Sequence, residues 1–202
     1  HRLANEWCDL IGGRTTHPIR AVVGGWTKLP TAEELRGLGK RIVDALPDVE
    51  AAVEFFRKLP IPSFTRETEY LALKQPEEYA WYGGDIASTD GDVTPLQQYK
   101  SKVKEFIVPH STAKRTRGNR DSFAVGALAR VNVNYDQLAP LAKQAAEALG
   151  LRPICCNPYM NTVAQVVETA HVLEDSLRLI DALLERGLHE ESHTLQVRPG
   201  TG

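Results

Sequence analysis

The chain has 202 residues, enough for one domain of slightly above average size or for two small ones. Charged residues make up 25% and hydrophobic residues 42% of it, and its net charge is −2, so the charge favours neither nucleic acid nor an anionic membrane as a partner. No apolar run approaches the roughly 18 residues that a membrane-spanning helix needs. These numbers predict a soluble globular protein that binds neither nucleic acid nor a membrane.

The cysteines and the opening residues carry two further expectations. Three cysteines without C-x-x-C spacing predict free thiols in a reducing compartment and no self-contained metal site; they are Cys8, Cys155 and Cys156. The chain opens with His1, and its first apolar residues follow helical spacing without an N-cap. We therefore expect a segment of a larger protein.

A glycine-rich segment follows this first helix, over residues 11–18, and Gly24 and Gly25 come shortly after it. Glycine pairs open backbone conformations closed to other residues, and Pro18 favours an extended backbone at His17. Arg14 and His17 on such a turn can reach a ligand or a neighbouring subunit. The alternative interpretation is a helix end followed by an irregular loop.

The next elements are predicted from caps and prolines. Thr31 as N-cap and Glu34 three residues later form a capping box for a helix to about residue 46. Pro47 predicts a kink or a break before helical periodicity resumes and continues to residue 59. Aromatic and β-branched runs at 67–74 and 79–82, with glycine turns, predict a small antiparallel sheet of two to four strands within 67–95.

The second half of the chain is predicted to be mainly helical. Thr94 and Pro95 predict a helix that carries apolar side chains as far as residue 107, followed by an irregular polar stretch over 110–122. A short buried helix is expected over 124–133, and another runs from about residue 135 to a stop at Gly150. Asn157 as N-cap, with Pro158 at the first helical position, begins a helix of about 40 Å that ends at Gly187.

These elements predict a mainly α (α+β) fold over residues 1–202, taken as a single domain. It is a helical bundle with a long C-terminal helix and a small antiparallel sheet.

Three clusters of reactive or charged residues each allow a functional and a structural interpretation. A basic cluster suits a phosphate or an acidic partner, or is a solvated loop; it comprises Lys114, Arg115, Arg117 and Arg120. Asp85, Asp90 and Asp92 superficially resemble a calcium loop, but their spacing is wrong and favours a hairpin turn. The adjacent thiols of Cys155 and Cys156 precede a helix N-terminus, which stabilises thiolates, but the alternative is buried structural thiols.

No nucleophile elbow, P-loop or dinucleotide fingerprint occurs, so these residues alone specify no reaction. His110 and His171 have no ligand partner at metal-binding spacing.

Six stretches resemble, in order, those of one known family: Gly12–Pro18 with Val22–Gly25, Arg66–Tyr70, Gly84–Gly91, Ser111–Lys114, Val125–Asn132 and Cys156–Pro158. Together they resemble the large subunit of nickel–iron hydrogenases, in the soluble cytoplasmic class that includes sulfhydrogenases and the F420- or NAD-linked enzymes. The resemblance covers nearly the whole chain.

The resemblance implies that the parent enzyme oxidises hydrogen or reduces protons at a nickel–iron centre. In the family, four cysteines of an R-x-C-x-x-C type and a D-P-C-x-x-C type motif bind this centre, and neither motif occurs in this chain. A family segment whose arginine packs over the iron would also follow residue 202. The resemblance thus implies a central scaffold portion with no catalytic residue, no metal ligand and no cofactor of its own.

The resemblance also assigns roles to residues and a partner. Arg14 and His17, with Gly24 and Gly25, are expected to face the small subunit, with His17 close to an iron–sulfur cluster of that partner. Lys114 and Arg130 are weaker candidates, which either support the site or form structural salt bridges. The class implies a cytoplasmic location, and surfaces that the rest of the subunit would cover make self-association of the isolated piece plausible.

Two other interpretations stay open. A structural paralogue, like the related subunit of respiratory complex I, keeps the scaffold without the metal and acts in binding or assembly. An unrelated helical interaction module would require all six matches to arise by chance.

Overall fold

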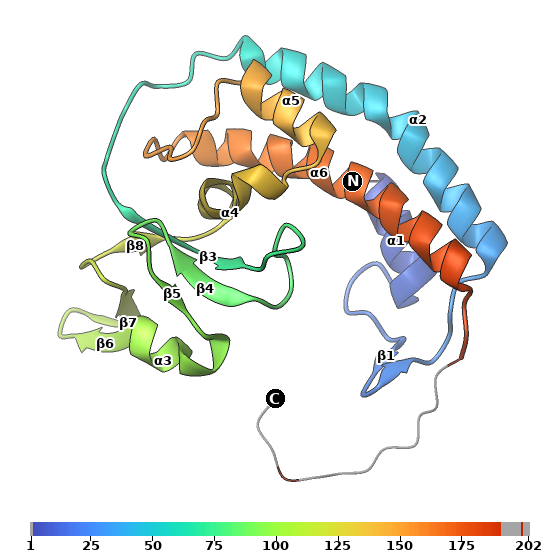
Figure 1. Ribbon diagram of the computed structural model, residues 1–202, viewed down its shortest axis with the longest axis horizontal. Helices are drawn as coiled ribbons and strands as arrows, with labels where there is room; N and C mark the ends of the chain where they lie inside the picture. The colour runs from blue at the N-terminus through green and yellow to red at the C-terminus, as the bar shows by residue number, and fades with distance from the viewer. Residues whose placement is uncertain (1, 191–198, 200–202) are drawn as a thin grey trace. The chain divides into compact units, whose positions relative to one another are not determined.

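The computed structural model describes residues 2–190 and residue 199. By its internal contacts the chain divides into two compact units. Unit 1 comprises His1–Pro47 and Asp175–Gly202, and unit 2 comprises Asp48–Glu174. Figure 1 shows the course of the elements along the chain. Two long helices, α2 (Ala32–Arg57) and α6 (Met160–Arg186), contribute residues to both units.

Unit 1 contains α1 (Arg2–Gly12), a hairpin of β1 (Ala21–Val22) and β2 (Gly25–Trp26), and parts of α2 and α6. The capping box predicted for α2 is confirmed: the Thr31 N–H donates to Glu34 Oε2 (2.7 Å), and the Glu34 N–H donates to Thr31 Oγ1 (3.2 Å). Pro47 lies inside α2, so this helix is not broken there.

The apolar face of α2 is narrow within unit 1. Leu35, Leu38 and Ile42 are buried at helical spacing. Gly39 brings α2 close to α6, since a Cβ added there would lie 3.9 Å from the side chain of Ile180.

Unit 2 contains a four-stranded sheet in the order β5-β4-β3-β8. Its strands are β3 (Glu69–Lys74), β4 (Asp85–Ser88), β5 (Val93–Thr94) and β8 (Phe123–Ala124). The antiparallel pairing predicted for this region is confirmed for β3, β4 and β5, whereas β8 joins β3 in parallel.

The strand predicted over 79–82 is wrong. This stretch is irregular, and its first two residues, Tyr79 and Ala80, are buried. Its apolar character therefore reflects core packing rather than strand pairing.

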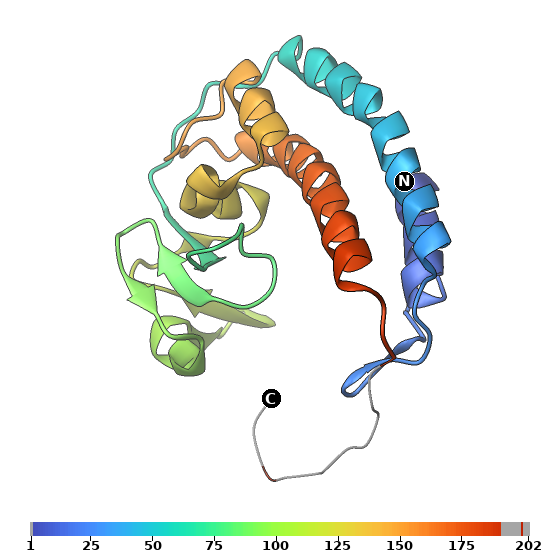
Figure 2. The same cartoon turned by 45° about the vertical axis from the view of Figure 1, so that its right-hand side comes forward.

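Helices cover this sheet. The short helix predicted over 124–133 is confirmed as α4 (Ala127–Asn134), which packs on β3. A 3₁₀ turn, η2 (Tyr135–Gln137), separates it from α5 (Pro140–Ala148), so the helix expected from residue 135 begins later. Figures 1 and 2 both show α4 and α5 beside the first part of α6. The main core cluster lies in unit 2 and draws mostly on these helices.

Unit 2 also contains a hairpin that the sequence did not predict. After β5 come a 3₁₀ turn, η1 (Leu96–Gln98), and a four-residue helix, α3 (Tyr99–Lys102). The chain then forms β6 (Lys104–Val108) and β7 (Ser111–Arg117), an antiparallel pair. The helix expected as far as residue 107 and the irregular stretch expected over 110–122 are therefore wrong.

The long C-terminal helix is confirmed as α6. Asn157 Oδ1 accepts a hydrogen bond from the Tyr159 N–H (3.1 Å), as an N-cap does, and Gly187 ends the helix with φ = 80°. None of the helices in the described part of the chain combines the length and the apolar character needed to cross a membrane.

Candidate functional site

The glycine-rich loop of unit 1 folds back onto the end of α1. The Gly12 carbonyl accepts hydrogen bonds from the N–H groups of Ile19 (3.0 Å) and Arg20 (3.2 Å). Gly12 is buried against Pro18, where an added Cβ would lie 3.1 Å from the proline Cβ. The Arg20 guanidinium donates to the Leu10 carbonyl, so it satisfies an acceptor at the C-terminal end of the helix.

The backbone at His17 corrects one expectation. Instead of being extended, His17 has φ = 56°, the left-handed region that residues other than glycine rarely enter. The reason is the turn itself, because the chain reverses direction between Gly12 and Ile19. Such strain costs of order 1–3 kcal/mol and often occurs at functional positions.

The predicted loop residues are presented to the outside of unit 1. Both Arg14 and His17 are exposed. Gly24 and Gly25 belong to the β1–β2 hairpin, in which Val22 pairs with Gly25 and Gly24 has φ = 88°. A two-residue turn with positive φ at its second position favours glycine, so Gly24 has a structural reason for its identity.

A buried carboxylate organises the sheet side of unit 2. The side chain of Glu69, on β3, is fully buried and accepts four hydrogen bonds. Its Oε1 accepts from Ser88 Oγ (2.8 Å) and Lys102 Nζ (2.8 Å). Its Oε2 accepts from the backbone N–H groups of Asn119 (2.8 Å) and Arg120 (3.2 Å). We call this arrangement the Glu69 clamp; it joins β3, β4, α3 and the chain after β7.

Two ion pairs surround the Glu69 clamp. Lys102 Nζ also donates to Asp92 Oδ2 (2.8 Å), and the Arg120 guanidinium donates to both carboxylate oxygens of Asp90 (3.0 and 2.6 Å). Burial raises the pKa of Glu69, but the bonds from Lys102 and Ser88 outweigh this effect and lower it overall. The bond from Lys102 likewise lowers the pKa of Asp92. These groups therefore stay charged near neutral pH.

Close packing explains one glycine of this region. A Cβ added at Gly118 would lie 2.5 Å from Glu69 Oε2, so only glycine lets the backbone approach the carboxylate. The three carboxylates that superficially resemble a calcium loop make contacts within the protein: Asp90 and Asp92 bind basic side chains, and Asp85 accepts a hydrogen bond from the Leu96 N–H.

Arg130 forms a second polar cluster, on the helical side of unit 2. Its guanidinium donates to both oxygens of Glu168 (2.6 and 2.8 Å) and lies 5.1 Å from the centre of the Trp81 ring. The Tyr79 hydroxyl donates to the same Glu168 (2.8 Å). Burial raises the pKa of Tyr79 far above its usual range, so the hydroxyl keeps its proton.

The two adjacent cysteines are held through their backbones. The Asn132 side chain bonds both the Cys155 carbonyl (3.0 Å) and the Cys155 N–H (2.9 Å). The Cys156 carbonyl accepts from the Arg66 N–H (3.0 Å). Both thiols are half-buried and free. Burial raises the pKa of Tyr70, and the nearby Cys156 and Cys155 thiols add to this shift.

Three of the six stretches named in the sequence converge on one pocket of unit 2. Its volume is about 460 Å³, and its lining is mainly apolar. Arg66–Tyr70, Val125–Asn132 and Cys156–Pro158 all contribute lining residues, which we call the motif pocket: Phe64, Arg66, Thr68, Tyr70, Ser122, Phe123, Ala124, Val125, Leu128, Pro158 and Asn161. Asn161 Oδ1 accepts from the Leu128 N–H (3.1 Å), which fixes α4 to α6.

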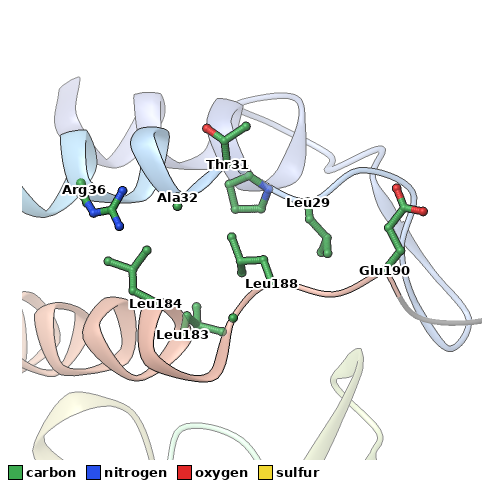
Figure 3. Close-up of a pocket in the computed structure, with 10 residues that line it drawn as sticks. Leu29, Thr31, Ala32, Arg36, Leu183, Leu184, Leu188 and Glu190 are labelled. Carbon is green, nitrogen blue, oxygen red and sulfur yellow. The ribbon is translucent and has the colours of Figure 1, made fainter.

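A further pocket, of about 430 Å³, lies in unit 1 between the start of α2 and the end of α6 (Figure 3). Leu184 and Leu188 project from the α6 side toward Ala32 and the start of α2, and Arg36 and Glu190 lie at opposite ends. None of the residues predicted to be functional lines it.

The residues predicted from the sequence do not form one cluster within a unit. Unit 1 contains the predicted loop residues Arg14, His17, Gly24 and Gly25. Unit 2 contains the two basic candidates, Lys114 and Arg130. Lys114 is exposed and pairs with Glu105 (2.6 Å). Neither the Glu69 clamp nor Glu168 could be recognised from local sequence patterns, because their partners lie 19 to 89 positions away in the chain.

The sequence of the chain is similar to hydrogenase subunits. It is 33% identical to Sulfhydrogenase 1 subunit alpha of Pyrococcus furiosus, over 96% of this chain and 46% of that protein. It is 25% identical to Sulfhydrogenase 2 subunit alpha of the same organism, over 96% and 45%. The chain therefore spans about half the length of the curated relatives that it matches. No family model matches the chain.

Two solved structures share its fold. An NAD⁺-reducing [NiFe]-hydrogenase in the H2-reduced state superimposes with a TM-score of 0.70 at 22% identity, over 96% of this chain and 48% of that one. The reduced Ni-Fe-Se hydrogenase of D. vulgaris Hildenborough gives 0.64 at 21% identity, over 98% and 50%. The predicted fold class, mainly helical with a long C-terminal helix and small sheets, is confirmed.

Proposed function

Since the chain is homologous to the large subunits of nickel–iron hydrogenases over about half of their length, we propose that it is the scaffold portion of such a subunit. The complete subunit would oxidise hydrogen or reduce protons at a nickel–iron centre. The observation that carries this proposal is the 33% identity to a sulfhydrogenase alpha subunit, which extends over 96% of the chain.

The residues of this chain do not fit a nickel–iron centre. Such a site needs four thiolates that converge in space. Cys8 lies in unit 1, whereas Cys155 and Cys156 lie in unit 2. Within the described residues, no group of three or more His, Cys, Asp or Glu side chains is arranged to hold a metal ion. We therefore place the ligands of the centre in the rest of the subunit.

What unit 2 contributes is a frame held together by buried polar contacts. The Glu69 clamp fixes the sheet to the segment after β7, and the Arg130–Glu168 pair fixes α4 to α6. Because buried polar groups are costly unless paired, each network favours a single arrangement of its elements. A metal site elsewhere in the subunit gains from such a frame, since catalytic geometry depends on the supporting structure.

The partner would be the small, iron–sulfur subunit of the enzyme, and the loop with Arg14 and His17 would face it. Two observations support this assignment: both side chains are exposed, and His17 is held in a strained conformation that the turn imposes. A positive or hydrogen-bonding side chain beside an iron–sulfur cluster stabilises the reduced state and raises its potential. A cytoplasmic location suits the three free cysteines.

Metal analysis of two proteins tests the proposal. We expect the complete subunit, purified with its partner, to contain stoichiometric nickel and to reduce a viologen dye with hydrogen. The 202-residue chain alone should contain none. A complete subunit without nickel or hydrogen-dependent activity would favour the metal-free structural paralogue, and stoichiometric nickel in the short chain would refute the placement of the ligands.

His17→Ala in the complete enzyme tests the loop assignment. Loss of the imidazole should lower the potential of the nearest cluster and slow electron transfer, while the nickel content stays unchanged. Thr16→Ala, at the neighbouring exposed position, is the control. Redox titration and catalytic current measure the effect, and an unchanged potential together with an unchanged current would reject the role of His17.

A further inference from the structure

The β6–β7 hairpin, residues 104–117, leaves most of its surface uncovered; we call it the arm. Every residue over 104–107 and 112–117 is exposed, including Ile107 at 78%. In Figure 1 the arm lies below the β3–β4 sheet, whereas α4 and α5 lie above it. A hairpin of two strands is marginally stable by itself in water, and in the described part of the chain no third strand pairs with either edge of this one.

The base of the arm is nevertheless fixed firmly. Lys102, two residues before β6, donates to Glu69 Oε1, and the N–H groups of Asn119 and Arg120, just after β7, donate to Glu69 Oε2. One buried carboxylate thus holds both ends. The arm is therefore a positioned projection of unit 2 rather than a loose loop.

The two faces of the arm differ in charge. The register places Lys104 opposite Arg117 and Phe106 opposite Arg115, and the Arg117 guanidinium lies 5.7 Å from the centre of the Phe106 ring. Side chains of directly paired residues share a face, so three cations surround one aromatic ring. We call these four residues the basic face. Glu105, at the adjacent position of β6, pairs with Lys114.

The basic face is electrostatically unfavourable without a counter-charge. Like charges directly opposite one another, as Lys104 and Arg117 are, destabilise a strand pair. The Glu105 carboxylate is already bound to Lys114 Nζ, at 2.6 Å. An acidic surface laid against the basic face would remove the repulsion, and the Phe106 ring would add apolar contact.

We propose that the basic face of the arm docks against an acidic segment of the same subunit, in the part of that subunit that lies outside these 202 residues. The proposal rests on the proposed function, because that function makes the chain one part of a longer subunit. The chain matches 46% and 45% of its two sulfhydrogenase relatives, so more than half of each is available to cover surfaces of this half. The clamped base suits a permanent contact within one subunit.

Site-specific photo-crosslinking in the complete, purified enzyme tests the docking. Benzoylphenylalanine replaces Phe106 on the basic face, and in the control protein it replaces Tyr82, which is 92% exposed on unit 2. After irradiation and digestion, mass spectrometry identifies the linked peptides. We expect the probe at 106 to link to a peptide of the same subunit outside residues 1–202 that contains Asp or Glu, and we expect the probe at 82 not to link to it.

Every other result at position 106 overturns the proposal: a link to a different subunit, to a second copy of the subunit, only to residues 1–202, or to nothing. Nickel content and hydrogen-dependent dye reduction are measured on the same wild-type enzyme. An enzyme with nickel but without the expected link refutes the docking alone. An enzyme that shows the link but lacks nickel refutes the proposed function alone.

Charge reversal provides a second measurement. The variant Arg115→Glu of the complete enzyme, which leaves the Lys104–Arg117 pair intact, should expose the arm, so the amide hydrogens of β6 and β7 should exchange about tenfold faster or more than in the wild type. Lys100→Glu, an exposed lysine outside the arm, is the matched control and should leave this exchange unchanged. Equal exchange in Arg115→Glu and the wild type would contradict the docking.

Discussion

Glu69 is the residue that joins three separate segments of unit 2, because four hydrogen-bond donors from these segments converge on its carboxylate. Replacing it with Gln removes the fully buried one of the two carboxylates that bind the Lys102 ammonium and leaves only the partly exposed Asp92. Breaking a buried ion pair on one side costs about 3–5 kcal/mol. We therefore expect Glu69→Gln to lower the free energy of unfolding by about that amount, measured by urea denaturation.

Glu67→Gln is the matched control for that variant. The side chain of Glu67 is 82% exposed and lies 3.5 Å from Arg120, so its loss removes only a surface ion pair. The stability of this control should stay close to that of the wild type. If both variants lost the same stability, the burial of Glu69 would not be the cause.

The same cluster predicts how stability depends on pH. The bonds from Lys102 lower the pKa of Glu69, after the opposing effect of burial, and of Asp92 below their ordinary values of 4.5 and 3.8. Carboxylates with lowered pKa contribute their full stability above the ordinary value, and this contribution is lost as the pH falls through the lowered pKa. Stability should therefore decline from about pH 4.5 downward, and the decline should be shallower in Glu69→Gln. Thermal unfolding at pH 2–7 measures both slopes.

The alkaline side has the opposite sign. Burial lowers the pKa of Lys102, but the bonds to Asp92 and Glu69 outweigh this effect and raise it above 10.5. The contribution of Lys102 is complete below that value and is lost as the pH rises through the raised pKa. The Glu69 clamp as a whole is therefore most stabilising between these limits.

None of these roles could be predicted from the sequence. A glutamate in a strand next to Tyr70 carries no local sign of burial, and its partners Lys102 and Asn119 follow 33 and 50 residues later. The stretch Arg66–Tyr70 was recognised by resemblance, but its function as the centre of the clamp required the tertiary structure. Local sequence patterns indicate helix caps and apolar periodicity. They do not indicate which distant charged residues will pair in the folded protein.

At the scale of secondary structure, the N-terminus of α2 is the element end that the sequence predicted best. Thr31 and Glu34 exchange the two bonds of a capping box. Thr31→Ala should lower stability by about 1 kcal/mol, because the Glu34 N–H loses its acceptor. Thr31→Ser keeps the hydroxyl and should retain most of the stability. Denaturant unfolding of the two variants checks this, and equal losses would show that the hydroxyl does not act as the cap.

The two incorrect predictions over residues 94–122 share one physical cause. Helix α6 has an apolar stripe, a cap at Asn157 and a stop at Gly187, so its pattern was unambiguous. The arm has no such pattern, since the apolar residues of β6 are consecutive (Phe106, Ile107 and Val108), β7 has only Ala113, and nearly all of both strands is exposed. Periodicity reports burial of one face, so it fails for an element that the described chain does not bury.

At the scale of the whole chain, the core is distributed unevenly between the two units. All members of the main core cluster lie in unit 2, between Val49 and Ala170. Among the described residues of unit 1, the buried large apolar ones are few: Leu35, Leu38, Ile42 and Ile180. Because buried apolar surface provides most of the stability, unit 1 should open at a lower free energy than unit 2.

Native-state hydrogen exchange tests this difference within single helices, because α2 and α6 each run through both units. Amides of α6 over 163–173 should be protected more strongly than those over 177–186, and in α2 those after Pro47 more strongly than those before it. The comparison within one helix removes differences in helix type and solvent conditions. Uniform protection along both helices would mean that residues 1–202 unfold as a single domain, as the sequence predicted, whereas a step near Pro47 and Glu174 would establish two cooperative units.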